Sequence, residues 1–253
     1  MIFLVGTGLS KGDLTQKAIE TCAKGELFLD KYTSKVNGET LTAIKKSTGK
    51  VPTTLSRSEM EERAQELVEK AKEKDIVIIV GGDPLIATTH KILFLAARKK
   101  GVKVEVVHAG SIFTAAIGES GLDFYKFGKT FTIPKWSDHY KPVSFYETLM
   151  KNRSIGAHTL ALLDYDSEKE SSMAINEALA ELESAEKQYG KGLVTDKTEI
   201  FVMSNLCQPN ETKEYIRFGE AKAKNHESGP ALLIIPSQLS DIEREIVETM
   251  YAD

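Results

Sequence analysis

The first 107 residues alternate short apolar runs with helical patterns. Residues 2–5 form an apolar run that leads into a glycine loop, and Thr15 then begins a helical pattern. The run Ile-Val-Ile-Ile-Val at 76–80 is rich in β-branched residues and does not alternate with polar ones. Such a run is typical of a central parallel strand that is covered on both faces. With further strands predicted at 27–29 and 102–107, this order indicates an α/β domain with a mostly parallel sheet.

One helix is expected before the run at 76–80 and one after it. Ser58 and Glu61 have the spacing of a capping box, and a helix with one buried face should follow it. The residues expected on that buried face are Met60, Ala64, Leu67, Val68 and Ala71. After the run, Thr88 or Thr89 can begin another helix that ends near Lys100.

The pattern changes from Gly110 onward. The stretch 122–134 is rich in β-forming residues and suits an extended or antiparallel segment. We therefore expect two α/β domains, residues 1–109 and residues 110–253, the second with a mixed sheet. The elements predicted in the second domain are helices at 144–151 and 172–187 and strands at 159–163, 199–204, 215–219 and 232–235.

A last helix is predicted near the end of the sequence. Ser240 and Glu243 form a capping box, which marks its first turn. Its apolar residues are Ile242, Ile246, Val247 and Met250, and their spacing predicts one face turned towards the core.

Composition and charge exclude several classes of protein. Hydrophobic residues make up 41% and charged residues 28% of the chain, which is typical of globular proteins and argues against disorder. The formal net charge is −4, so the chain lacks the basic excess of a dedicated duplex nucleic-acid binder. Its apolar runs are far shorter than the roughly 18 residues of a membrane span. We expect a cytoplasmic protein whose two cysteines, Cys22 and Cys207, are reduced core thiols.

The glycine loop after the first strand favours a ligand site only weakly. Gly6 and Gly8 would let backbone amides approach a pyrophosphate, and Asp30 closes the second strand where it could accept a bond from a ribose. The third glycine of the dinucleotide fingerprint is missing, because residue 11 is Lys. The alternative is a tight turn between strand and helix.

The sequence Gly-Gly-Asp-Pro at 81–84 is more informative. It ends a buried parallel strand, and open α/β sheets bind ligands at the carboxyl ends of their strands. Asp83 would reach into that crevice, and the backbone of Leu85 and Ile86 would be available to an adenine or amino-acid group. The alternative is an Asx turn without a binding role.

Other chemistry lacks a signature. The five histidines show no metal-ligand spacing, and no phosphate loop or nucleophile motif is present. An aromatic group, Phe124, Tyr125, Phe127 and Phe131, is interpreted as core or as a subunit interface.

The two glycine segments, read together, carry a family resemblance. Residues 5–15 (VGTGLSKGDLT) and 81–90 (GGDPLIATTH) resemble the tetrapyrrole methylase superfamily of S-adenosylmethionine-dependent methyltransferases. Further segments are similar to the diphthine synthase family within it. These segments are Tyr32-Thr33-Ser34, HAGSIFTAAIGESGLDFYKFGKT at 108–130, PVSFYE at 142–147 and HTLALLDYD at 158–166.

This resemblance implies an activity and a partner. Family members methylate the amino group of the 3-amino-3-carboxypropyl-histidine of elongation factor 2, and they bind S-adenosylmethionine in a cleft between two α/β domains. The product S-adenosylhomocysteine and a homodimer are also implied. No metal and no catalytic base are implied. The residues implied to contact the cofactor are Leu9, Asp83, Ile86, Ser111, Ile112, Leu163, Ser204 and Ala231.

Two alternatives remain open, a precorrin or tetrapyrrole methylase and a non-catalytic module that binds a nucleotide or elongation factor 2. Under the favoured interpretation, Lys126, Lys129 and Lys135 form a local basic patch for the elongation factor. The aromatic stretch 124–131 would contribute the dimer interface.

Overall fold

The computed structural model describes residues 1–32, 36–56, 60, 64–166 and 169–252. The chain forms two compact units. The first comprises Met1–Ile112 and the described part of Ser167–Glu170, and the second comprises Phe113–Asp166 and Ser171–Asp253. Each unit contains one five-stranded sheet, and the first unit has a hydrophobic core on either face of its sheet.

The sheet of the first unit is entirely parallel, in the order β3-β2-β4-β1-β5. The prediction for 76–80 is confirmed, because this run is β4, all five of its residues are buried, and it pairs with β1 and β2. The strands are β1 (Ile2–Gly6), β2 (Glu26–Asp30), β3 (Thr53–Leu55), β4 (Ile76–Val80) and β5 (Val104–Val107).

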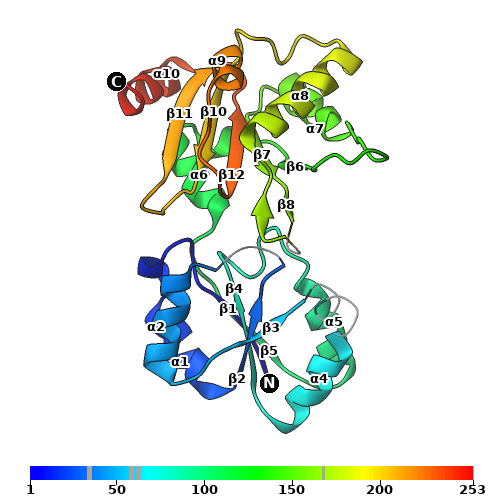
Figure 1. Ribbon diagram of the computed structural model, residues 1–253, viewed down its shortest axis with the longest axis vertical. Helices are drawn as coiled ribbons and strands as arrows, with labels where there is room; N and C mark the ends of the chain where they lie inside the picture. The colour runs from blue at the N-terminus through cyan, green and yellow to red at the C-terminus, as the bar shows by residue number, and fades with distance from the viewer. Residues whose placement is uncertain (33–35, 57–59, 61–63, 167–168, 253) are drawn as a thin grey trace. The chain divides into compact units, whose positions relative to one another are not determined.

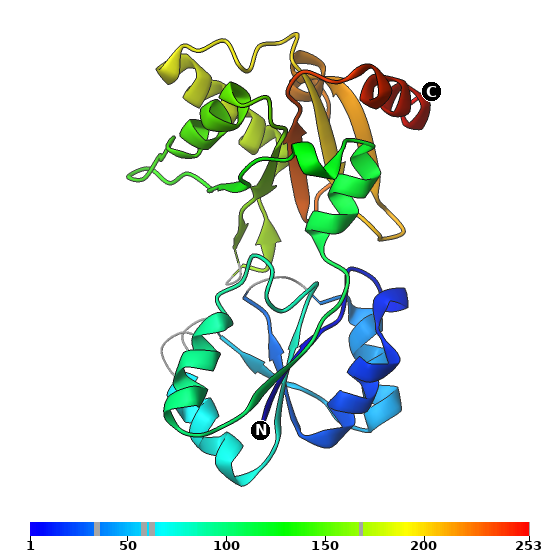
Figure 2. The same cartoon turned by 180° about the vertical axis from the view of Figure 1, so that it is seen from behind.

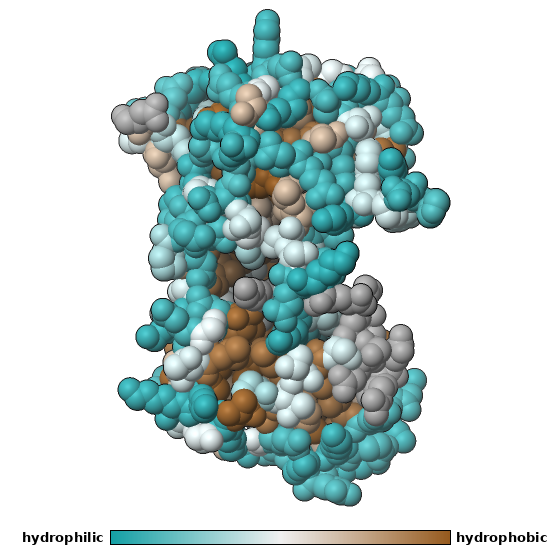
Figure 3. All heavy atoms as spheres, viewed as in Figure 1, coloured by the Kyte–Doolittle hydropathy of each residue, from teal (hydrophilic) through white to brown (hydrophobic). Residues whose placement is uncertain are grey.

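Helices cover both faces of this sheet (Figures 1 and 2). Helices α1 (Gln16–Lys24) and α2 (Gly38–Thr48) cover one face, and α4 (Ala64–Glu73) and α5 (Lys91–Lys99) cover the other. Successive strand residues therefore enter different cores, as Leu4 and Val5 do. Figure 3 shows hydrophobic residues of this unit between the two helix layers, whose outer surfaces are mostly hydrophilic.

The local signals of the first unit are mostly confirmed. The Thr15 side chain caps α1 by accepting a hydrogen bond from the Ala18 amide, at 3.1 Å. All five residues expected on the inner face of the helix after residue 58 are buried. The predicted capping box of that helix, Ser58 with Glu61, lies outside the described residues. Helix α5 begins after His90, one or two residues later than expected, and neither Thr88 nor Thr89 is its cap residue.

The second unit contains a mixed sheet in the order β11-β10-β12-β7-β6, which confirms the predicted fold class. Only β6 and β7 are parallel, and the other neighbours run antiparallel. The strands are β6 (Phe131–Ile133), β7 (Thr159–Leu163), β10 (Glu199–Ser204), β11 (Thr212–Arg217) and β12 (Ala231–Ile235). A separate hairpin pairs β8 (Tyr165–Asp166) with β9 (Ser171–Ser172).

Three helices pack against one face of this sheet and form the largest part of its core. They are α7 (Phe145–Ser154), α8 (Ile175–Tyr189) and α9 (Phe218–Ala223). Helix α6 (Ile112–Ser120) and α10 (Asp241–Met250) complete the unit. A contact at the end of α10 joins them, because the Tyr251 hydroxyl donates to the Glu119 carbonyl at 2.7 Å and its ring contacts Phe201 edge-on.

Two predictions for the second unit are wrong in detail. The stretch 122–134 is interrupted, since Phe124–Lys126 forms a 3-10 turn capped by Asp123, and its strand β6 pairs in parallel with β7 and not antiparallel. The strand expected at 215–219 is shifted, because β11 ends at Arg217 and Phe218 begins α9. The chain turns inward after β11, and Phe218 is therefore buried in the core.

The capping box of α10 is confirmed, but of the four apolar residues predicted to line the helix only Val247 is buried. The Ser240 hydroxyl accepts from the Glu243 amide at 3.3 Å, and the Glu243 carboxylate accepts from the Ser240 amide at 2.8 Å. Glu243 and Val247, one turn apart, point inward and are buried. Ile242, Ile246 and Met250 lie on an adjacent stripe and are 71%, 41% and 47% exposed. The inner face of α10 thus includes a buried charged residue, Glu243, which the apolar pattern did not place there.

The cysteines differ in environment. Both are free, but only Cys22 is a buried thiol, and Cys207 is exposed, contrary to the expectation of a core position. Burial raises the pKa of Cys22 to about 11. In the part of the chain that the structure describes, no helix has the length and apolar character needed to span a membrane.

Candidate functional site

The loops that follow β1 and β4 are joined to each other. Gly8 and Gly82 form an antiparallel bridge, with amide-to-carbonyl distances of 3.3 and 2.9 Å. Both glycines have a positive φ, 71° at Gly8 and 69° at Gly82. A Cβ at Gly8 would lie 2.1 Å from the Cβ of Asp13, so a side chain there is excluded. The two glycine motifs of the sequence therefore build one structure at the carboxyl edge of the sheet.

Asp13 holds the first glycine loop closed. Its Oδ2 accepts hydrogen bonds from the Leu9 and Ser10 amides at 2.8 and 2.9 Å. These are the amides that a pyrophosphate would need in a dinucleotide site. The loop is thus satisfied by its own carboxylate, which argues against the dinucleotide interpretation.

Asp83 joins the loop after β4 to the segment after β5. Its Oδ1 accepts from the Leu85 amide at 2.9 Å, and its Oδ2 contacts His108 Nδ1 at 2.7 Å and the Ala109 amide at 3.3 Å. The carboxylate is buried, whereas the His108 side chain is 67% exposed. The bond from the Leu85 amide forms the expected Asx turn. The contacts with His108 and Ala109 show that Asp83 also joins the end of β4 to the end of β5.

The cofactor residues predicted in the first unit follow three adjacent strands. Leu9 follows β1, Asp83 and Ile86 follow β4, and Ser111 and Ile112 follow β5. Ser111 is buried and Ile86 is exposed, with its amide donating to the Asp83 carbonyl at 3.3 Å. The chain leaves β1 and β4 towards opposite faces of the sheet, and such a reversal creates a ligand crevice in open α/β sheets.

The backbone at this edge is open to a ligand. A Cβ on Gly82 would have no neighbour closer than 3.8 Å, and one on Gly110 none closer than 4.0 Å. Bare peptide groups beside an exposed apolar residue, Ile86, suit the flat base and ribose of a nucleoside. The residues present are therefore compatible with an adenosine-containing cofactor.

A buried histidine, His90, contacts the loop after β4, and the sequence analysis assigned it no role. His90 Nδ1 lies 2.9 Å from the Pro84 carbonyl, and its Nε2 lies 2.9 Å from Asp30 Oδ2. Both ring nitrogens of His90 are therefore within hydrogen-bond distance of an oxygen, and the imidazole links the loop after β4 to the end of β2. Asp30 is fully buried in this pair and also accepts from the Tyr32 amide at 2.8 Å, so it cannot serve a ribose as first suggested.

The three predicted residues of the second unit also lie together. Ser204 and Ala231 are direct partners across β10 and β12, and Leu163 ends the neighbouring strand one residue beyond the pair Leu162–Leu232. Ser204 is buried and its hydroxyl bonds Thr212 Oγ1 at 2.8 Å. Ala231 is only partly buried. Their contact with a cofactor stays a prediction.

One member of the predicted basic patch has a structural role instead. Lys126 Nζ pairs with the Glu243 carboxylate and donates to the Gln238 carbonyl at 3.2 Å. Lys129 and Lys135 are exposed, and Lys135 lies 3.5 Å from Glu177. Among the described residues, no group of three or more His, Cys, Asp or Glu side chains could hold a metal ion.

Known proteins that are similar to this chain show its family. A family model for tetrapyrrole (corrin/porphyrin) methylases matches residues 1–221. The chain is 33% identical to a diphthine synthase of Methanococcus maripaludis (strain C5) over 99% of both chains, and 34% identical to one of Methanocaldococcus jannaschii over 98% of both. A crystal structure of diphthine synthase matches with a TM-score of 0.87 at 29% identity, over 99% of this chain and 96% of that one. The chain therefore belongs to the diphthine synthase group of the tetrapyrrole methylase family, and it is a methyltransferase.

Proposed function

We propose that this protein uses S-adenosylmethionine to methylate the amino group of the 3-amino-3-carboxypropyl-histidine of elongation factor 2, in the cytoplasm. The observation that carries the proposal is the joined pair of glycine loops at the carboxyl edge of the first sheet. This edge provides bare backbone and Asp83 in a chain whose relatives are diphthine synthases.

Two groups of residues are proposed to hold the cofactor. The first is the edge formed by Leu9, Asp83, Ile86, Ser111 and Ile112. The second is the strand edge with Leu163, Ser204 and Ala231. When bound, the cofactor supplies a sulfonium methyl group, which is already a strong electrophile.

The protein then has to position the acceptor amine against the methyl group and to exclude water from it. The acceptor amine must lose its proton and lie in line with the methyl group, and exclusion of water disfavours the ammonium form. We assign no residue as the base, because a desolvated amine needs none in the displacement itself.

The proposal is tested with the whole protein in two steps. S-adenosylhomocysteine should raise the melting temperature, and NAD should not, because Asp13 already occupies the amides that a dinucleotide would need. Radiolabelled methyl groups should then move from S-adenosylmethionine to elongation factor 2 that carries the modified histidine. Elongation factor in which that histidine is unmodified is the matched control.

Other outcomes separate the alternatives. Transfer to a precorrin and none to the factor would favour the tetrapyrrole substrate. A complex with elongation factor 2 without any transfer would favour a non-catalytic module. Stabilisation by NAD alone would overturn the cofactor assignment.

A further inference from the structure

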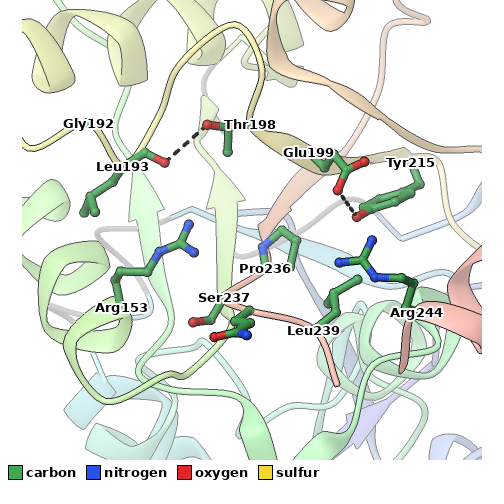
Figure 4. A pocket seen from close by; sticks show the side chains of 11 residues that line it. Arg153, Gly192, Leu193, Thr198, Glu199, Tyr215, Pro236, Ser237, Leu239 and Arg244 are labelled. Atoms are coloured by element: carbon green, nitrogen blue, oxygen red, sulfur yellow. Dashed lines mark hydrogen bonds between the residues drawn. The ribbon is translucent and has the colours of Figure 1, made fainter. Parts of the chain in front are cut away.

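The second unit contains a pocket at the end of its sheet where β10 begins and β12 ends (Figure 4). Its volume is about 420 Å³. The predicted cofactor residues Ser204 and Ala231 lie at the opposite ends of the same two strands. Pro236 comes five positions after Ala231, which corresponds to about 17 Å along a strand. This pocket is therefore distinct from the edge proposed for methylation.

Two arginines line the pocket, and neither has an acidic partner among the described residues. Arg153 comes from the last turn of α7 and Arg244 from the first turns of α10, and Figure 4 shows Pro236, Ser237 and Leu239 between them in that view. Neither guanidinium makes a hydrogen bond or ion pair with any described residue. Arg153 is half-buried, and this burial lowers the pKa of its guanidinium. A bound anion would offset that desolvation.

The segment after β12 adds donors that have no partner in the part of the chain that the structure describes. Ser237 is only 8% exposed, yet its hydroxyl bonds no group in the described part of the chain. The Gln238 and Leu239 amides likewise donate to none of the described residues. The Ser237 amide, by contrast, is used, because it donates to His158 Nδ1 at 2.9 Å. The backbone is thus fixed while the Ser237 hydroxyl and the next two amides stay available.

The pocket contains one carboxylate, and it is already engaged. The Tyr215 hydroxyl donates to Glu199 Oε2 at 2.8 Å. Glu199 forms no ion pair with either arginine, so its carboxylate oxygens lie more than 4 Å from the nitrogens of both guanidinium groups. The two arginines and Glu199 leave a net charge of +1 in the lining.

We propose that this pocket binds the phosphate group of a small phosphorylated molecule. The lining offers two guanidinium groups, the Ser237 hydroxyl and two amides as donors against one carboxylate, and phosphate oxygens are the acceptors that such donors prefer. The volume lies within the range of pockets that enclose small molecules, so there is room for the rest of the ligand. This inference does not depend on the proposed methylation.

The experiment measures binding to the full-length protein by calorimetry. The probes are inorganic phosphate and ribose 5-phosphate, with ribose and potassium chloride at equal ionic strength as controls. We expect saturable binding of ribose 5-phosphate and none of ribose. Binding of inorganic phosphate equal to that of the sugar phosphate would identify a free-anion site instead and overturn the small-molecule part.

Variants locate the site. Arg153→Gln and Arg244→Gln should each weaken ribose 5-phosphate binding about tenfold or more, the loss expected for a charge-assisted hydrogen bond. Ser237→Ala should weaken it less. Arg98→Gln, an exposed arginine of α5, is the matched control and should leave binding unchanged.

Folding is checked by the melting temperature of each variant, and Arg153→Lys provides a second test if Arg153→Gln is unstable. This variant keeps the charge but loses the planar pair of donors, so we expect partial binding. Absence of saturable binding at millimolar ribose 5-phosphate, or binding unaffected by both arginine variants, would overturn the proposal.

Discussion

At the scale of single residues, Asp83 links the loop after β4 to the segment after β5. We expect Asp83→Ala to weaken S-adenosylhomocysteine binding about ten- to a hundredfold, because contacts of a buried carboxylate contribute about 1.5 to 3 kcal/mol. Calorimetric titration measures the dissociation constant. Asp196→Ala, which removes an exposed carboxylate of the second unit, is the control. An unchanged constant for Asp83→Ala would reduce this residue to a turn former.

Residue-level reasoning found the positions but not their partners. The residue types in the Gly-Gly-Asp-Pro segment identified a loop at a strand end, because that depends on neighbours in sequence. The contacts of Asp83 with His108 and of His90 with Asp30 span 25 and 60 residues. Pairings over such distances depend on the strand order β2-β4-β1-β5, which local spacing does not specify. The available signals were Asp30 at the end of one strand, interpreted as a possible ribose acceptor, and His90, without an assigned role, after another.

At the scale of elements, Glu243 connects α10 to the rest of the second unit. It caps the helix through Ser240, and it accepts from His158 Nε2 at 2.9 Å and from the Asp123 amide at 3.1 Å. His158 Nδ1 accepts from the Ser237 amide, so Nε2 carries the proton donated to Glu243. Burial by itself would raise the pKa of Glu243, but these bonds and Lys126 hold it well below the usual range.

This pKa shift gives a pH-dependent prediction. A carboxylate with a lowered pKa in the folded protein stabilises it fully above about pH 4.3, the pKa when unfolded, and less as the pH falls towards the folded value. Glu243→Gln should therefore lower the free energy of unfolding at pH 7 by about 3 kcal/mol, and the difference should shrink in acid. Chemical denaturation at pH 7 and in acid tests both parts. Glu245→Gln, an exposed residue of the same helix, should behave like wild type, and equal losses at both pH values would contradict the mechanism.

Element boundaries were predictable where burial and chain pattern coincide. The limits of β4, β7 and β10 match the predicted runs, because each strand is largely buried and bounded by polar or glycine residues. Helix α2 and strand β3 had no such pattern, since β3 buries only Leu55. The stripe Ile242, Ile246 and Met250 misled because exposed apolar residues have the same spacing as a buried face.

At the scale of the whole molecule, we expect a homodimer. Of the aromatic stretch predicted as the dimer interface, Phe131 packs on the core and is not available. Phe124 and Tyr125 are 62% and 91% exposed, and they remain candidates for the interface. Light scattering should give twice 27.9 kDa at micromolar concentration. Phe124→Asp with Tyr125→Asp should shift the mass towards the monomer, and Val51→Asp, at an exposed apolar residue of the first unit, should not. A wild-type mass of 27.9 kDa would contradict this expectation.

Docking of elongation factor 2 also concerns the whole molecule, and two of the three lysines of the predicted basic patch can be tested for it. With a net charge of −4, attraction to the factor has to be local. Lys126 is excluded from the test, because its ammonium pairs with Glu243 and its replacement would disturb α10. We expect Lys129→Glu with Lys135→Glu to raise the KM for the factor several-fold and to reduce its salt dependence. The dissociation constant of S-adenosylhomocysteine should not change. If methylation by this double variant equals that of wild type at low salt, the docking surface does not include these lysines, and the cofactor assignment stands independently of it.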